Sequence, residues 1–494
     1  MNILRGSRVK KSSKKANRFT SSIEFDAPIA RHVIKINMAH ILSLLRSREV
    51  GSEIAAPCLE FFLRLPEKMK LDNDTEDVHQ MIEQEAIRKI GIEKAGQINL
   101  GKSRNDQVVT AIRMEARERL LRLSEALISV QKALELASQR SGDLVIPGYT
   151  HLQHAQPVTL SFHLQSYFDG FERDFSRLTE AYSRLNLSPM GAAALAGTSV
   201  LVNRRYVASI LAFDGLVKNA MDAVSSRDFA VELVSCAEMI MIDMSRLAEE
   251  IILWSSSEFG FVEVSDLHAA TSSIMPQKKN PVVAEMIRAK CGSVLGHLSA
   301  ICSILKALPN SYNLDLQEVT PHLWSALSDA ASSAELMAEM LSNLFFSEDS
   351  INSALEDDKS TATELANHLV RRHHLPFRRA HAIVGELVRE SLKKGSTFIS
   401  TVVDELPAVS AKVTGKAIRI NWSEAEQILD PKKTLGMIKS EGGANPRLIR
   451  NRASENSTRV KKHEAWLDRS RTRLQRGDRL LKKDIRDAFK GVRN

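Results

Sequence analysis

The spacing of the prolines is the feature that most constrains how this chain can fold. The sequence has no proline between Pro66 and Pro147, between Pro157 and Pro189, or between Pro189 and Pro276. An internal proline removes a helical hydrogen bond and clashes with the preceding turn, so long helices are expected within such intervals.

Each interval contains a seam of apolar side chains separated alternately by three and four residues. The seams are Ala116, Leu120, Leu123, Leu127, Val130 and Leu134; Leu164, Phe168, Phe171, Phe175, Leu178, Tyr182 and Leu185; and Ala230, Leu233, Ala237, Ile240, Met244, Leu247, Ile251 and Trp254. A period near 3.5 is typical of helices that pack nearly parallel, although unrelated surface helices are the alternative. Two further apolar-rich stretches, Pro281–Leu308 and Asp315–Phe346, bring the expected core to five helices.

Composition argues against a β-sandwich or barrel. The 494 residues include only 22 Gly, 14 Pro, 17 Phe, 5 Tyr and 4 Trp, too few for a large array of strands and turns. We therefore expect an all-α fold, with a long central helical bundle between smaller helical domains. The expected divisions are a basic N-terminal tail (1–18), an N-terminal domain (19–103), the bundle (104–350) and a C-terminal helical domain with a basic tail (351–494).

The net charge of +8 is unevenly distributed. Residues 1–18 contain seven basic and no acidic residues, and residues 446–494 contain sixteen basic and six acidic residues, which leaves a net charge of −9 between these ends. Basic ends bind nucleic acid, stay solvated or pack against other subunits. Because no recognisable nucleic-acid-reading motif accompanies them, nucleic acid is not the favoured partner.

The sequence also indicates a compartment. Its most apolar stretch, Val231–Trp254, contains six charged side chains and so does not resemble a membrane helix. Four cysteines without a CxxC pair or histidine-associated spacing predict neither disulfides nor a metal site. The basic N-terminus lacks the apolar core of a secretory signal, so we expect a soluble cytoplasmic protein.

Three polar segments interrupt the helical pattern and carry groups that bind anions or move protons. The first is Gly101–Gln107 (GKSRNDQ), which contains Ser103, Arg104 and Asn105. A hydroxyl, a guanidinium and a carboxamide at a helix N-terminus suit a carboxylate ligand. The alternative is that Ser103 or Asn105 simply caps the helix.

The other two polar segments contain two prolines each: Pro147 and Pro157 end the second, and Pro276 and Pro281 lie in the second half of the third. Pro147–Pro157 (PGYTHLQHAQP) holds His151, which either transfers protons near pH 7 or is a structural turn residue. Thr271–Pro281 (TSSIMPQKKNP) has paired serines and lysines before a proline-started helix, and can bind an anion and present a hydroxyl to it. Its prolines, together with Ile274–Met275, which we expect to be buried, argue against an exposed basic linker.

These segments resemble the motifs of a known enzyme superfamily. SSIMPQKKNP is similar to the signature loop of the fumarase/aspartase superfamily, whose members form or break a C–N or C–O bond with fumarate as the common product. Six further motifs resemble the argininosuccinate lyase branch, in the same order, over roughly residues 17–450. They are EDVH (76–79), KSRNDQ (102–107), PGYTHLQHAQP (147–157), SPMG (188–191) with AGT (196–198), AVSSRDF (223–229) and YNLDLQE (312–318).

The resemblance implies a fumarase/aspartase-like bundle that catalyses β-elimination of argininosuccinate to arginine and fumarate, in arginine biosynthesis, without metal or organic cofactor. It assigns abstraction of the Cβ proton to Ser272, support of proton movement to His151 and orientation of that histidine to Glu285. Lys278 and Asn280 match the residues that stabilise the doubly charged aci-carboxylate.

The resemblance also implies the substrate contacts. Ser103, Asn105 and Thr150 match residues that hold the fumarate portion. The arginine portion is expected at Ser22, Asp26, Tyr312 and Gln317, with Arg104 and His79 lining the cavity. Family members form tetramers in which three chains build each site, so a homotetramer with shared sites is expected.

Three positions depart from the family pattern. Thr271 stands where glycine is usual, Leu314 where arginine is usual, and Thr320 where a substrate-contacting lysine is usual. The last two losses keep open a superfamily lyase acting on another N-substituted aspartate, such as adenylosuccinate. A non-catalytic homologue is a further alternative, but the retention of all the catalytic residues argues against it.

Overall fold

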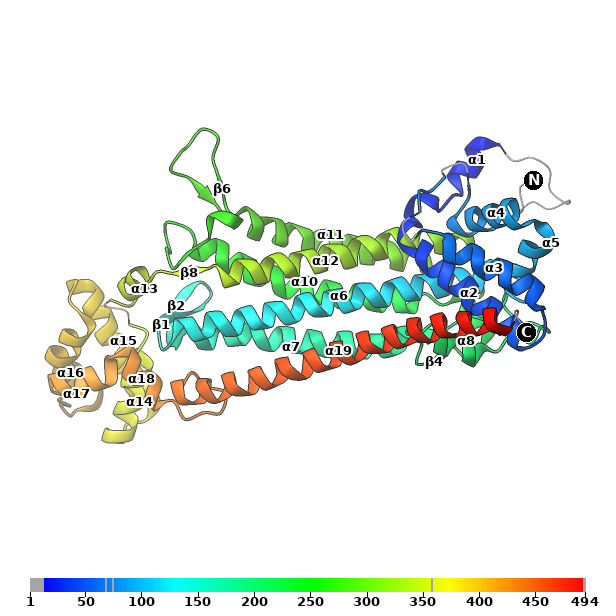
Figure 1. Cartoon of the computed structure of the whole chain (residues 1–494). Helices are drawn as coiled ribbons and strands as arrows, with labels where there is room; N and C mark the ends of the chain where they lie inside the picture. Colours follow the sequence, from blue (N-terminus) through cyan, green and yellow to red (C-terminus); the bar gives the residue numbers. More distant parts are fainter. Residues whose placement is uncertain (1–12, 67–68, 73–74, 357–358, 492–494) are drawn as a thin grey trace.

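The computed structural model describes residues 13–66, 69–72, 75–356 and 359–491. It is a long rod of helices with a smaller group of helices at each end (Figure 1). Residues 1–12, most of the expected basic N-terminal tail, lie outside the described residues.

Five long helices form the rod, at the places where the apolar stretches predict them. They are α6 (Arg104–Ser141), α7 (Leu160–Leu185), α10 (Asp228–Trp254), α11 (Val282–Leu305) and α12 (Val319–Ser342). α6 packs against α7 and α12, and α10 packs against α7, α11 and α12. The apolar seams form the interior, where Leu127, Phe171 and Ile240 are fully buried. The expectation of an all-α fold with a central bundle is confirmed.

The longest bundle helix, α6, begins where the sequence supplies a cap. The Ser103 hydroxyl accepts a hydrogen bond from the Asn105 N–H, and the Asp106 carboxylate accepts one from the Ser103 N–H. This reciprocal arrangement satisfies N–H groups that have no partner within the first helical turn. α6 ends before Gly142, whose φ of 52° favours a residue without a side chain.

The N-terminal helices pack on one end of the rod and share its core. They are α1 (Lys14–Phe19), η1 (Ile23–Phe25), η2 (Ala27–Ile29), α2 (Ala30–Arg46), α3 (Ser52–Arg64), α4 (Val78–Ile90), α5 (Ile92–Ala95) and η3 (Gly96–Asn99). One buried apolar cluster includes Ile23, the bundle seams and Ile351. The expected boundary at residue 103 is therefore the start of a helix rather than a break in the core.

Short paired strands connect the helices. β1 (Val145–Thr150) and β2 (Gln153–Thr159) form an antiparallel hairpin, and β6 (Ala270–Thr271) pairs with β7 (Lys279–Asn280) at the base of a loop. The other short elements are β3 (Leu187–Ser188) with β4 (Gly215–Leu216), β5 (Val262–Glu263) with β8 (Phe345–Phe346), α8 (Arg204–Ile210), α9 (Ala220–Ser225), η4 (Asp266–His268) and η5 (Leu314–Gln317). The hairpin and the β6–β7 loop coincide with the second and third polar segments.

A group of helices near the C-terminus has a core of its own. These helices are α14 (Ala362–His373), α15 (Phe377–Lys394), α16 (Phe398–Thr414) and α17 (Trp422–Leu429), flanked by α13 (Glu348–Leu355) and α18 (Pro431–Met437). Leu365, Ile383, Leu387, Val402 and Leu406 are fully buried in this second cluster. They form a unit at the end of the rod opposite the N-terminal helices (Figure 1).

The last helix differs from the expected basic tail. α19 (Pro446–Gly491) is a single 46-residue helix that runs back along the rod and contacts α6, α7, α2 and α8 (Figure 1). Val460, Leu467, Leu481 and Ile485 are buried in the main core, and several basic side chains form ion pairs with the bundle. The prediction of a tail is wrong because apolar side chains recur along this segment together with the charges.

The apolar seams of the helices face one another, and charged side chains occupy other faces. None of the helices in the described residues is both long enough and apolar enough to cross a bilayer.

Candidate active site

A cavity of about 260 Å³ lies between the N-terminal helices, the start of α6 and the segment before α12. Seven residues implied by the family resemblance line it: Ser22, Asp26, His79, Arg104, Asn105, Tyr312 and Gln317. Leu314 and Thr320, two of the departures from the family pattern, line it as well. The cavity is slightly smaller than typical small-molecule sites of about 300–1,000 Å³, so it suits one portion of a ligand.

Ser22 and Asp26 form a hydrogen-bonded pair in this cavity. The Ser22 hydroxyl donates to Asp26 Oδ2 (3.1 Å), which also accepts a bond from the Val78 N–H (3.0 Å). Burial raises the pKa of Asp26 to about 7; the Val78 N–H opposes this shift, and the Asp77 carboxylate adds to it. The Asp26 carboxyl group therefore changes charge near neutral pH.

Arg104 and His79 also line the cavity. Arg104 Nη1 donates to Asp77 Oδ2 at 2.7 Å, so its positive charge is already paired. His79 is buried, and burial lowers its pKa to about 4. The imidazole is thus neutral at pH 7, and within the described residues its nitrogens make no hydrogen bond of good geometry.

Asp106 ties the start of α6 to the loop that follows Gly191. Its fully buried carboxylate accepts hydrogen bonds from three backbone N–H groups, those of Ser103 (3.0 Å), Gly191 (3.0 Å) and Ala193 (2.9 Å). Asn105 Nδ2 donates to the Ala194 carbonyl at 3.0 Å. These bonds fix Ser103 and Asn105 relative to each other and to the loop.

Thr150 and His151 lie at the tip of the β1–β2 hairpin, at the other end of α6 (Figure 1). His151 and Leu152 have φ values of 57° and 55°, as in the two-residue turn whose twist matches that of a hairpin. Both Thr150 and His151 are exposed. The hairpin thus makes the imidazole accessible to groups outside the core of this chain.

The loop between β6 and β7 carries Ser272. Its hydroxyl oxygen accepts hydrogen bonds from the N–H groups of Ile274 (3.3 Å) and Met275 (3.1 Å), and its own N–H donates to the Lys278 carbonyl (3.3 Å). Two main-chain donors at one oxygen stabilise negative charge there. Thr271 pairs within a strand and has no positive φ, so threonine fits here without backbone strain.

The surroundings of this loop differ from expectation. Ile274, expected to be buried, is 82% exposed, and Met275 is 41% exposed, because the loop projects from the rod (Figure 1). The prediction of a buried apolar pair is wrong for the isolated chain. Lys278 and Glu285 are exposed as well, and no hydrogen bond or ion pair within the described residues joins Glu285 to His151.

The cavity lies too far from the hairpin, and too far from the β6–β7 loop, for all three to form one site within one chain. α6 has 38 residues, which at 1.5 Å per residue separate Ser103 from the hairpin by about 57 Å. α11 has 24 residues and separates Asn280, at the end of β7, from the Tyr312 side of the cavity by about 36 Å. Figure 1 shows the hairpin and the β6 loop toward the end of the rod away from the N-terminal helices.

Two cations near the cavity, the buried Arg227 and the half-buried Lys102, were not among the residues expected from the sequence. Arg227, the residue before α10, is 4% exposed and lines the cavity with Tyr312 and Thr320. Lys102 donates a hydrogen bond to Asn37 in an adjoining cavity of about 230 Å³, and burial lowers its pKa to about 8. Both residues lie within family-like motifs, which were a signal, but neither motif reveals how far their charges are buried.

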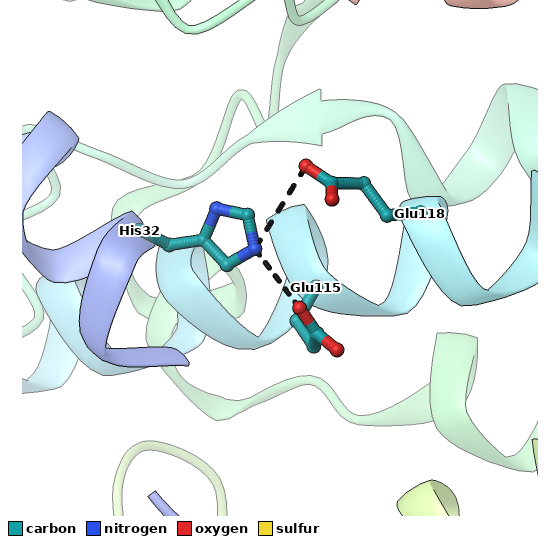
Figure 2. A group of neighbouring side chains, drawn as sticks. All are labelled: His32, Glu115 and Glu118. Carbon is teal, nitrogen blue, oxygen red and sulfur yellow. Dashed lines mark hydrogen bonds and ion pairs between the residues drawn. The ribbon is translucent and has the colours of Figure 1, made fainter. Parts of the chain in front are cut away.

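Within the described residues, one group of side chains has the composition of a metal site. His32, Glu115 and Glu118 each offer a ligand atom within 4.8 Å of the others (Figure 2). Arg31 Nη2, however, lies 2.6 Å from Glu115 and 2.8 Å from Glu118, and Arg119 Nε lies 2.8 Å from Glu115. Burial acts to raise the pKa of Glu115, but hydrogen bonds from His32 and Arg31 lower it to about 2. Two guanidinium groups thus balance two carboxylates, which is the composition of an ion-pair network.

Family models match two parts of the chain. Residues 6–296, more than half of the sequence, match a model described as "Lyase". Residues 359–435 match a model described as "Argininosuccinate lyase C-terminal".

Individual proteins resemble the chain over nearly its whole length. It is 41% identical to the argininosuccinate lyase of Methanothrix thermoacetophila over 99% of this chain and 98% of that one. It is 38% identical to the argininosuccinate lyase of Methanocaldococcus jannaschii over 97% of this chain and 99% of that one. Among solved structures, an EDDS lyase variant with bound fumarate has a TM-score of 0.87 at 28% identity, over 99% of this chain and 98% of that one.

Proposed function

The chain belongs to the argininosuccinate lyase family of the fumarase/aspartase superfamily, and on this premise we propose how its residues carry out the reaction. The reaction is β-elimination of argininosuccinate to arginine and fumarate, a step of arginine biosynthesis. The observation that carries the site assignment is the cavity at the start of α6. Residues from four of the family-like motifs, EDVH, KSRNDQ, AVSSRDF and YNLDLQE, line this one cavity.

The reacting centre needs a base and fixed donors. The Cβ proton next to a carboxylate is weakly acidic, and its removal creates a doubly charged aci-carboxylate that cationic and hydrogen-bonding groups must stabilise. Ser272 acts as the base in its alkoxide form, which takes the Cβ proton to become the hydroxyl; the two main-chain N–H groups at its Oγ stabilise the alkoxide before the transfer. Lys278 adds positive charge when the loop closes over substrate.

The fumarate portion is held by Ser103, Asn105, Thr150 and Asn280. Capping of α6 is compatible with this role for Ser103. Its hydroxyl oxygen accepts the Asn105 N–H, and its own O–H remains able to donate to a substrate carboxylate. The cap and ligand interpretations of the sequence are therefore not exclusive.

His151 supports proton movement at the leaving nitrogen, and Glu285 orients the imidazole. Both side chains are exposed in one chain, on the hairpin and on the first turn of α11. Exposure of two ionisable groups assigned to one step fits a site that is completed by other chains.

The cavity receives the arginine portion. Asp26 offers an anionic acceptor to the guanidinium group, and Ser22, Tyr312 and Gln317 offer hydrogen bonds. Arg104 and His79 complete the wall, Arg104 already paired with Asp77 and His79 neutral.

We further propose a homotetramer in which three chains contribute to each site. The roughly 57 Å length of α6 supports this, because no single substrate bridges that distance. Apolar side chains left exposed on the rod also support it. They are Met239 and Ile242 on α10, Met286 and Leu295 on α11, and Leu336 on α12. Such faces are typical of surfaces that another subunit covers.

The assignment is tested by fumarate release, followed in the ultraviolet, from argininosuccinate, adenylosuccinate, aspartate and malate. The expected result is release from argininosuccinate with a kcat/KM at least about tenfold above the other three, a barrier difference of about 1.4 kcal/mol. No release from argininosuccinate by the assembled protein would overturn the proposal.

A second candidate is a lyase for another N-substituted aspartate. Leu314 and Thr320 favour it, since both stand where cations are usual in the family. The structural similarity to EDDS lyase, at 28% identity, also favours this second candidate. A higher kcat/KM on such a substrate than on argininosuccinate would support this candidate.

We propose that the enzyme works in the cytoplasm and that these side chains and backbone donors suffice for the chemistry. Cys58, Cys236, Cys291 and Cys302 are free thiols, which suits a reducing compartment.

A further inference from the structure

Arg227 is a buried cation that lines the cavity. Its side chain is 4% exposed, and its Nη1 donates to the backbone carbonyls of Val224 (3.2 Å) and Ser226 (3.0 Å). Its Nε is buried without a hydrogen-bond partner, and no carboxylate among the described residues forms an ion pair with it. This guanidinium is thus held in place by backbone groups that leave its charge unbalanced.

An unbalanced buried charge is unfavourable unless a ligand offsets it. Burial lowers the pKa of Arg227 to about 10, and the neighbouring Arg113 acts in the same direction. The group nevertheless stays protonated at pH 7. The protein therefore retains a desolvated positive charge in the cavity.

Three carboxyl groups line the cavity, those of Asp26, Glu76 and Asp77, and within the described residues none of them forms an ion pair with Arg227. Asp77 is paired with Arg104 at 2.7 Å. Asp26 accepts its hydrogen bonds from Ser22 and from the Val78 N–H. Among the described lining residues, Arg227 is the guanidinium left for an anion from outside the chain.

Arg227 lies in the part of the cavity where this chain lacks two cations that are usual in the family. Leu314 and Thr320 line the same cavity, and Tyr312 is close enough for Arg227 to oppose the rise in its pKa that burial causes. We propose that Arg227 binds a carboxylate carried by the amine portion of the substrate and makes that carboxylate a requirement for efficient turnover. This rests on the proposed function and extends it, because it defines the leaving amine as an amino acid with a free α-carboxylate.

Guanidinium chemistry supports a carboxylate rather than a neutral group. Its planar fork of N–H donors matches the two oxygens of a carboxylate, and such charge-assisted bonds are the strong ones. Asp26 provides the opposite charge in the same cavity. Arg227 and Asp26 together complement a ligand that carries both a carboxylate and a guanidinium group, as the arginine portion does.

The test compares two substrates that differ only in this group: argininosuccinate, and the analogue in which agmatine, decarboxylated arginine, replaces arginine. The reacting C–N bond is the same in both. The wild type is expected to favour argininosuccinate by roughly 10- to 100-fold in kcat/KM, the value of one charge-assisted interaction. Equal kcat/KM values for the two substrates would overturn the proposal while leaving the proposed function intact.

Variants assign the preference to Arg227. Arg227→Gln should lower kcat/KM for argininosuccinate by roughly 10- to 100-fold and leave that for the analogue within about twofold, with partial recovery in Arg227→Lys. The control is Arg205→Gln, which removes an exposed arginine outside the cavity. Equal losses on both substrates, or no loss on argininosuccinate, would overturn the proposal.

A gain-of-charge variant keeps the test independent of how Arg227→Gln folds. If Arg227 already binds the carboxylate, Thr320→Lys adds a redundant cation and should not improve kcat/KM for argininosuccinate. A gain of about tenfold or more would mean that the carboxylate lacks a partner in the wild type, against the proposal. No fumarate from argininosuccinate in any of these proteins would overturn the proposed function, and this proposal with it.

Discussion

Asp77 and Ser103 each cap a helix and also stand at the candidate site, where Asp77 lines the cavity and Ser103 is proposed to bind substrate. Asp77 accepts the Gln80 N–H as the N-cap of α4 and pairs with Arg104. Ser103 caps α6 in the same way. A sequence identifies such residues as caps or as ligands but does not separate the two roles, because one oxygen accepts several hydrogen bonds. The residue types were predictable, whereas their dual use depends on contacts between distant segments.

Ser272 is the residue on which the chemistry depends most. Ser272→Ala should lower kcat by more than about tenfold, or 1.4 kcal/mol in the barrier, while the melting temperature stays close to that of the wild type. The physical reason is that a half-buried hydroxyl on a projecting loop contributes to the transition state more than to the core. The measurement is steady-state fumarate release beside thermal unfolding, with Ser273→Ala as the matched control. Turnover above about a tenth of wild type would remove Ser272 from the role of base.

Asp106 is expected to act as a positioning residue. Asp106→Asn replaces a carboxylate that accepts three backbone N–H groups, so Ser103 and Asn105 should lose their alignment and KM for argininosuccinate should rise at least tenfold. Asp143→Asn, at an exposed aspartate, is the control. A fall in kcat with no change in KM would contradict this role.

Asp26 gives the reaction a pH dependence. Its raised pKa of about 7 means that the free enzyme holds a neutral carboxyl below pH 7 and a carboxylate above it. The carboxylate is the form that attracts a guanidinium, so kcat/KM should fall as pH decreases through 7. In Asp26→Asn, this fall of kcat/KM at low pH should be lost, and argininosuccinate should bind much more weakly. A fall that persists unchanged in the variant would assign it to another group.

At the scale of elements, apolar periodicity predicted the bundle helices and failed for α19. Val460, Leu467, Leu474 and Leu481 recur every seven residues in α19, but the alternate seam positions are polar or small. Those positions still pack well. His463 stacks on Phe175 with ring centroids 3.8 Å apart, and Gly477 lies against Ala212. Polar or small residues that pack closely do not appear as an apolar repeat, so the sequence pattern did not predict that this face of α19 is buried.

α19 should therefore contribute to stability rather than behave as a solvated tail. Leu467→Ala removes a buried side chain and should lower the free energy of unfolding by about 2–5 kcal/mol. Arg469→Ala, on the exposed side of the same helix, should change it by less than about 0.5 kcal/mol. Urea denaturation followed by circular dichroism measures both. Equal, small effects would mean that the helix is not held against the bundle in solution.

At the scale of the whole molecule, the residue groups required for one reaction lie at opposite ends of a rod. The sequence predicted both the long helices and the motifs at their ends, and the helix lengths alone imply the separation. It did not predict which exposed faces meet, because a subunit interface depends on the shape of two surfaces. The cavity holds binding residues for one portion of the substrate, and the hairpin and loop carry the residues assigned to proton transfer.

The most direct test of this account is complementation between two inactive variants, His151→Asn and Ser272→Ala, refolded together. If the hairpin and loop of one site come from different chains, random mixed tetramers contain sites that lack both lesions, about one quarter of the total. Fumarate release from argininosuccinate should then recover to about that fraction of wild type, while each variant refolded alone stays inactive. No recovery from tetramers shown to be mixed, or full wild-type activity in a monomer, would contradict the account.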